Sequence, residues 1–170
     1  MRCAAEDAMF KVASKVVCVK LNAADNNVFI VTGDTAVFID AGHDDHDETS
    51  AVLEAWEKLS KPPVSAIVLT HRHGDHVGGA QKLAEATGAS EVLCSALEKP
   101  YIERAGTKVT RPVEDGEFMN LGGVTLQFIM SPGHTLGSLC VLYVAEAFLF
   151  TGDTILGTGT TSVNPEQGDM

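Results

Sequence analysis

The sequence predicts an α/β fold in which helices cover β-sheets, and three observations lead to this prediction. Residues 64–70 form a nearly continuous apolar run, typical of a strand buried on both faces. Helical periodicity occurs before this strand, at residues 47–59, and after it, up to about residue 87. From about residue 107 onward short strand-like runs dominate. This order of elements indicates a layered α/β architecture.

The first half of the chain contains a hairpin and a helix before the buried strand. Apolar runs at residues 28–32 and 35–40 flank Gly33-Asp34, a hairpin signal because Gly and Asp tolerate the positive φ of a tight turn. Residues 47–59 carry apolar side chains at helical spacing and acidic residues in the first turn. Pro62 and Pro63 are expected to end this helix.

The second half is expected to contain two short helices and several strands. One helix follows Gly78-Gly79, and a broken helix at residues 96–104 has room for Pro100 only near its start. The predicted strands are residues 91–95, 124–130, 139–144 and 148–151, the last two joined through Ala145-Glu146 as a hairpin.

The end of the chain supplies no clear helix, which makes the second half incomplete. After Asp153 come a Gly/Thr-rich loop and residues 164–170, and the sequence stops. A sheet face without its helix exposes apolar surface. We therefore expect one C-terminally truncated domain over residues 1–170, and a homodimer is one way of covering the exposed face.

Composition limits the class of protein. The 170 residues are 45% hydrophobic and 21% charged, which is ordinary for a globular domain. No apolar run approaches the roughly 20 residues that span a bilayer, and the N-terminus has no signal-peptide pattern. Cys3, Cys18, Cys94 and Cys140 form no CxxC pair, so we expect reduced, mostly buried thiols and a cytoplasmic location.

The net charge of −11 bears on the partner. Nucleic-acid binders draw much of their affinity from Lys and Arg contacts to phosphates, and this chain has no basic cluster. The charge disfavours nucleic acid and leaves a small-molecule substrate as the expected partner.

A dense group of metal-ligand residues follows the buried strand. His71 and His73 stand two positions apart and can face one way in an extended segment, while Asp75 and His76 can point to a second position nearby. Imidazoles and a carboxylate suit zinc or another divalent transition metal, including iron or manganese. Arg72 lies between two candidate ligands, and we expect it to face solvent.

Two further candidates lie at the ends of later strands. His134 is in the segment SPGHT, where Pro and Gly favour a tight turn. Asp153 is in FTGDT, directly after an apolar run. Each is a weak signal alone, but each gains weight beside the histidine-rich segment.

The segment HRHGDH resembles the HxHxDH signature of the metallo-β-lactamase superfamily. SPGHT and FTGDT are similar to the next two motifs of that family, and IDAG, which contains Asp40, is similar to its first. The resemblance covers roughly residues 16–160 and implies an αββα sandwich of the glyoxalase II-like or general hydrolase branch. It implies two zinc ions, one held by His71, His73 and His134 and one by Asp75 and His76, with Asp153 bridging both and Asp40 supporting the ligand loops.

By this resemblance the chain is a zinc-dependent hydrolase. A hydroxide between two metals would attack a thioester, ester or lactone, and Asp75 is the candidate catalytic residue that orients it. The family pattern ends with a further His, but none follows His134 here, so we expect weaker occupancy of the second metal.

Four other functions stay open from the sequence. The loop after Asp153 also resembles that of endoribonuclease-like members, which suggests RNA phosphodiester cleavage. Some members use one iron to oxidise persulfides, but they carry an Arg/Cys-containing stretch where residues 154–158 read TILGT. A true β-lactamase activity and a metal-binding fragment without turnover complete the alternatives.

Overall fold

The computed structural model describes residues 9–21 and 26–163. Cys3, the first eight residues and the sequence after residue 163 lie outside the described residues, so the expectations about them are not addressed by the structure. Within the described part, no helix combines the length and apolar character needed to cross a membrane.

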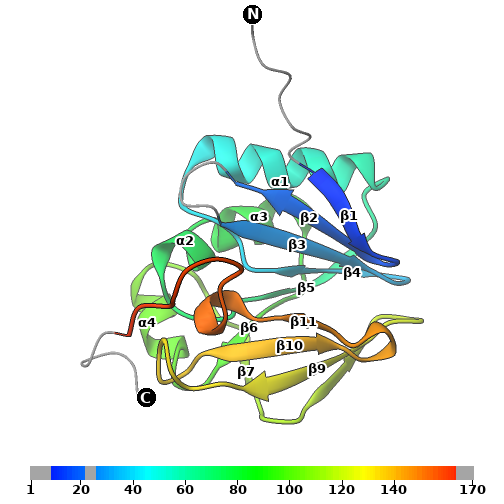
Figure 1. Ribbon diagram of the computed structural model, residues 1–170. Coiled ribbons are helices and arrows are strands. Elements are labelled where there is room, and N and C mark those ends of the chain that lie inside the picture. Colours follow the sequence, from blue (N-terminus) through cyan, green and yellow to red (C-terminus); the bar gives the residue numbers. More distant parts are fainter. Residues whose placement is uncertain (1–8, 22–25, 164–170) are drawn as a thin grey trace, which may run out of the picture.

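The first sheet runs β1-β2-β3-β4-β5-β6-β7 in the described part of the chain (Figure 1). Neighbours are antiparallel from β1 to β4 and parallel from β4 to β7. The strands are β1 (Met9–Ala13), β2 (Val16–Lys20), β3 (Asn27–Thr32), β4 (Ala36–Ile39), β5 (Val64–Val68), β6 (Glu91–Ser95) and β7 (Arg111–Val113).

Three helices cover one face of this sheet, namely α1 (His46–Lys58), α3 (Ala80–Thr87) and α4 (Lys99–Arg104). Val52, Leu83 and Ile102 project from them into the core against the sheet. The side chain of Asp45 caps α1 by accepting hydrogen bonds from the first-turn backbone amides. A separate four-residue helix, α2 (Gly74–Val77), precedes α3.

The second sheet packs on the opposite face of the first (Figure 1). Its order is β11-β10-β9-β8, all antiparallel, and its strands are β8 (Phe118–Asn120), β9 (Thr125–Met130), β10 (Leu139–Tyr143) and β11 (Phe148–Phe150). Buried apolar side chains of both sheets, including Ile39, Val68, Phe128 and Val141, fill the space between them.

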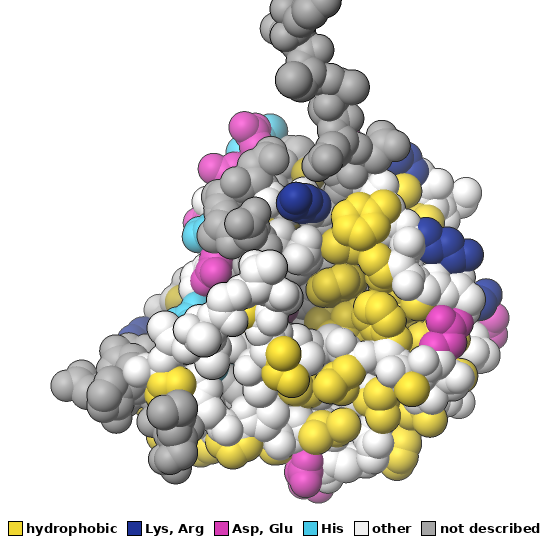
Figure 2. Space-filling model, viewed as in Figure 1, with side chains coloured by type: hydrophobic (Ala, Val, Ile, Leu, Met, Phe, Trp, Pro, Cys, Tyr) yellow, Lys and Arg dark blue, Asp and Glu magenta, His cyan; other side chains and the backbone are white. Residues whose placement is uncertain are grey.

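The outer face of the second sheet carries no helix among the described residues. Phe118 in β8 and Leu149 in β11 are 59% and 40% exposed. Figure 2 shows hydrophobic side chains gathered on the face that includes β1 and the strands of the second sheet. The described residues thus form three layers of the predicted αββα sandwich, namely helices, first sheet and second sheet, and no helix covers the second sheet within residues 26–163.

Most predicted elements are present within one or two residues. The hairpin around Gly33-Asp34 and the buried strand β5 match the prediction, and Pro100 stands at the start of α4. Cys18, Cys94 and Cys140 are free and buried, as expected. Three strands were not predicted. β1 shows no regular alternation of buried and exposed side chains, and β7 and β8 are only three residues long.

Candidate metal centre

Three segments that are distant in the sequence converge at one end of the two sheets. Residues 70–76 follow β5, residues 131–138 connect β9 to β10, and Asp153 lies in a 3₁₀ turn directly after β11. The amide of Leu139 donates a hydrogen bond to the carbonyl of Thr70 at 3.0 Å, which ties the second segment to the first. The strand ends therefore bring their histidines together, as the sequence predicted.

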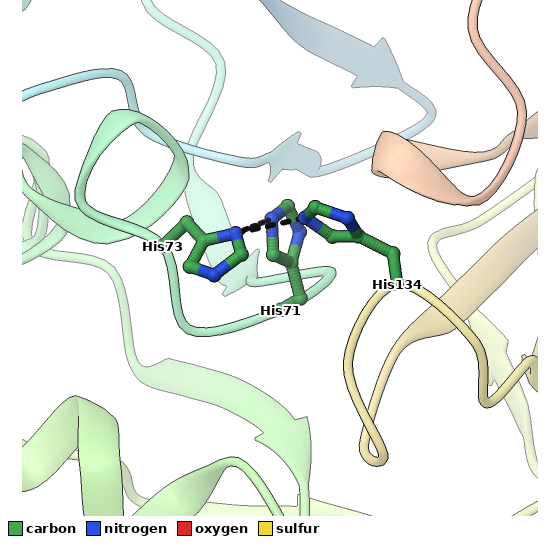
Figure 3. Close-up of side chains that lie close together, drawn as sticks. All are labelled: His71, His73 and His134. Carbon is green, nitrogen blue, oxygen red and sulfur yellow. Dashed lines mark hydrogen bonds between the residues drawn. The ribbon is translucent and has the colours of Figure 1, made fainter. Parts of the chain in front are cut away.

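Three imidazoles form the first donor cluster (Figure 3). Nε2 of His71 lies 3.1 Å from Nδ1 of His73, and Nε2 of His134 lies 2.8 Å from the same nitrogen. His71 and His134 are buried. Three ring nitrogens that face one point form a donor set that suits zinc.

Neighbouring groups orient two of these rings through their other nitrogen. Nδ1 of His71 lies 3.1 Å from Oγ1 of Thr70, and Nδ1 of His134 lies 2.6 Å from the carbonyl oxygen of Ser162. A metal-ligating histidine typically donates its second ring N–H in this way, which fixes the tautomer and the ring orientation. Both rings thus present Nε2 to the shared point, and the residues present fit a divalent metal.

The second donor cluster consists of His76 and Asp153 together with His71, which it shares with the first cluster. Asp153 lies between the two clusters. Its Oδ1 lies 3.2 Å from Nε2 of His76. Its Oδ2 lies 3.5 Å from Nε2 of His134 and 4.0 Å from Nε2 of His71. One carboxylate oxygen therefore faces each cluster. Oδ2 of Asp75 lies 3.6 Å from Nε2 of His76 and is close to the second cluster at its more exposed side.

Asp40 connects the two ends of the histidine-rich segment. Its Oδ1 accepts a hydrogen bond from the amide of Thr70 at 2.8 Å, and its Oδ2 lies 2.8 Å from Nδ1 of His76. The Asp40 side chain is buried and contacts His76 through Nδ1, whereas Nε2 of the same ring faces Asp153. Asp40 is therefore placed to support the segment from Thr70 to His76.

Burial and charge set the protonation of the clusters. Burial, with the nearby charge of His76, lowers the pKa of His71 to about 2. Burial also opposes a charge on His76, but the carboxylates of Asp40 and Asp153 outweigh it and raise its pKa to about 10. The hydrogen bond with His76 lowers the pKa of Asp153 to about 2. At neutral pH His71 is therefore neutral, with a lone pair for a metal, and His76 and Asp153 carry opposite charges.

A cavity of about 260 Å³ opens beside the second cluster. Asp40, His76 and Asp153 line its polar side. The other side includes Phe29 and Phe150, whose ring centroids are 5.1 Å apart. The cavity thus combines polar donors with an apolar wall, as small-molecule sites commonly do.

The prediction that Arg72 faces solvent is wrong. Its side chain is only 8% exposed, and its Nε lies 3.6 Å from Oε2 of Glu98. The guanidinium also stacks on Tyr101, with Cζ 4.0 Å from the ring centroid. Arg72 does not face solvent because a buried carboxylate and an aromatic ring hold it inside.

Two contacts at the site had not been anticipated. Thr70 links Asp40 to His71 through its hydroxyl, and its position directly before the histidine-rich segment was a usable signal. The contact between the carbonyl of Ser162 and His134 could not be predicted from the sequence, because any residue supplies a backbone oxygen. The contact also depends on how the loop after Asp153 folds back toward His134.

Comparison with known proteins agrees with this geometry. The family model described as the metallo-β-lactamase superfamily matches residues 23–170. An atrochrysone carboxyl ACP thioesterase of Cryptosporiopsis sp. is 31% identical over 149 residues, covering 85% of this chain and 42% of that protein. A hydroxyacylglutathione hydrolase of Francisella tularensis subsp. novicida is 34% identical over 121 residues, covering 71% of this chain and 46% of that protein.

Solved structures show the same fold. A metallo-β-lactamase of Cronobacter sakazakii aligns with a TM-score of 0.72 and 25% identity, over 84% of this chain and 60% of that one. One from Pontibacter korlensis gives a TM-score of 0.70 at 25% identity. The layered sheets and paired donor clusters define an α/β protein with a candidate two-metal site. The chain belongs to the metallo-β-lactamase superfamily, and it spans less than half the length of the curated relatives described above.

Proposed function

We propose that the chain forms the two-zinc centre of a hydrolase that acts on a thioester, ester or lactone. The observation that carries the proposal is the convergence of five donor residues on two adjacent points, with Asp75 as a sixth carboxylate-bearing residue beside the second point. In this proposal His71, His73 and His134 hold one metal. His76 and Asp75 hold the other, and Asp153 offers one oxygen to each.

Each side chain then has a defined task in the reaction. A bound pair of divalent ions supplies activation of a water molecule and stabilisation of the developing oxyanion. Asp75 is 29% exposed at the rim of the second cluster, where its carboxylate would accept a hydrogen bond from such a water and orient it. Asp40 keeps Nδ1 of His76 engaged, so that Nε2 stays directed at the site.

The substrate class rests on the relatives and on the cavity. The two curated relatives described above are named for thioesterase and hydroxyacylglutathione hydrolase activity. The wall that contains Phe29 and Phe150 favours a substrate with an apolar acyl group. The net charge of −11 disfavours RNA. The imidazole-rich donor set disfavours manganese, which prefers oxygen ligands, and suits zinc as well as iron.

The test measures hydrolysis by the zinc-loaded chain across a panel that contains an acyl-glutathione thioester, an aryl ester, a lactone, a β-lactam and a short RNA. We expect turnover of the thioester or ester, and loss of about 100-fold or more in kcat/KM for His71→Ala and Asp153→Ala. His46→Ala is the control, because that side chain is 91% exposed and outside both clusters. Full activity in His71→Ala would reject the proposal, and RNA cleavage alone would replace it with the phosphodiesterase alternative.

A further inference from the structure

A fully buried carboxylate lies between the two loops that carry the first donor cluster. Glu98, at the start of α4, is 0% exposed. Its Oε2 lies 3.6 Å from Nε of Arg72, the residue between His71 and His73. Its Oε1 accepts a hydrogen bond from the amide of Gly137 at 2.9 Å, three residues after His134. The same side chain therefore contacts both ligand loops.

The surroundings of Gly137 fit this contact closely. The hydroxyl of Ser95 donates a hydrogen bond to the carbonyl of Gly137 at 2.6 Å, so β6 and α4 hold both polar groups of that residue. A Cβ at position 137 would stand 2.4 Å from Oε1 of Glu98. Glycine allows the backbone to approach the carboxylate this closely.

A buried anion that contacts two loops is costly unless both contacts persist. Arg72 is held on its other side by Tyr101, so the charge pair has little freedom to rearrange. Glu98 contacts Arg72 and Gly137, which lie one and three residues from candidate ligands in the chain, so we place its influence on the imidazoles through the two loops. This separates it from the ligands themselves.

We propose that Glu98 is a positioning residue that clamps the His134 loop to the His71–His73 segment and so sets the spacing of the three imidazoles. The proposal rests on the metal-binding function proposed above. Removal of a residue that orients metal ligands commonly weakens metal binding by about 10- to 100-fold. We expect a loss of this size for Glu98→Gln, which keeps the shape and an acceptor for Gly137 but removes the charge that holds Arg72.

The experiment measures zinc affinity by chelator competition and the visible spectrum of the cobalt-loaded chain. Glu98→Gln should bind zinc about 10- to 100-fold more weakly and change the cobalt spectrum. Glu117→Gln is the charge control, because it breaks the ion pair with Arg111 at 2.8 Å outside the site. Ile102→Val is the stability control, because it trims the buried core of α4 without touching a polar contact. Wild-type affinity and spectrum in Glu98→Gln would overturn the proposal.

Two further measurements distinguish a failure of this proposal from a failure of the proposed metal-binding function. If Glu98→Gln does not fold, Gly137→Ala forces the Glu98 carboxylate away from the His134 loop, because its Cβ would stand 2.4 Å from Oε1, and unchanged zinc affinity in that variant would overturn the proposal. Amide exchange of residues 132–138, measured in the protein stripped of metal, should be about tenfold faster in Glu98→Gln than in wild type. A wild type that binds no zinc would reject the proposed function, while the exchange rates would still decide whether Glu98 holds the loop.

Discussion

Nδ1 of the buried His76 lies 2.8 Å from Oδ2 of Asp40, and Asp40 has a left-handed backbone with φ of 63°. A non-glycine residue seldom adopts this conformation without compensating contacts. The compensation is visible here, since the Asp40 side chain also accepts a hydrogen bond from the amide of Thr70 at 2.8 Å. Asp40 thus joins β4 to both ends of the histidine-rich segment.

Asp40→Ala should be strongly destabilising. It leaves the ring of His76 and the amide of Thr70 without their buried acceptor, which we expect to cost about 3 kcal/mol. Urea unfolding measures this free energy. Asp44→Asn is the control, because Asp44 pairs with Lys82 at an exposed position and should cost about 0.5 kcal/mol or less. A cost below about 1 kcal/mol for Asp40→Ala would contradict the assigned role.

Gly152→Ala should displace Asp153. Gly152 has φ of +48°, and a Cβ there would stand 2.5 Å from Oγ1 of Thr70. We expect a loss of about 2 kcal/mol in stability from backbone strain and crowding, together with weaker binding of the second zinc. Gly157→Ala is a matched control in the same loop, because a Cβ there meets no atom within 4 Å. Isothermal titration should show reduced zinc stoichiometry in the first variant alone, and equal behaviour of the two would refute the prediction.

Zinc binding should release a proton, and binding should strengthen as pH rises. The pKa of His76 is about 10 without a metal, so a metal that takes its Nε2 must displace a proton at any lower pH. His71, whose pKa is lowered to about 2, has none to release near neutrality. Affinity for the second zinc should therefore rise about tenfold per pH unit between pH 6 and 8. Titration calorimetry in two buffers of different ionisation enthalpy counts the protons, and a count of zero would contradict the assignment.

Two buried thiols should resist alkylation. Burial raises the pKa of Cys94 to about 12 and that of Cys18 to about 11, so the reactive thiolate is scarce at pH 8. In a Cys3→Ser background, iodoacetamide should leave both unmodified in the native protein and label both in guanidinium. Peptide mass spectrometry reads the sites. Rapid native labelling at Cys94 would show that the core between β6 and the helices opens readily.

The sequence indicated the candidate ligand residues more clearly than it indicated the edge strands of the two sheets. His71, His73 and His76 follow a strand that is buried and, apart from Ser65, apolar, and strand ends of a layered sheet present functional groups. His134 and Asp153 were weak signals alone, because their proximity depends on how the second sheet packs on the first. The short strands β7 and β8 have too few alternating residues for sequence periodicity to identify.

Polar contacts between residues far apart in the chain could not be predicted from the sequence, for a different reason. Arg72 was expected in solvent because neither Glu98 nor Tyr101 is near it in the chain. Glu98 and Tyr101 belong to the start of α4, and their contact with Arg72, which follows β5, is defined only by the folded structure. Buried ion pairs between separate elements have no local pattern, so sequence periodicity does not reveal them.

The central claim is that imidazoles and carboxylates from three strand ends share two adjacent metal ions. Anomalous diffraction at the zinc edge, from crystals of the zinc-loaded chain, tests it directly. We predict one peak among His71, His73 and His134 and a second beside His76 and Asp153. The absence of anomalous density at both positions, in crystals grown with excess zinc, would contradict the account.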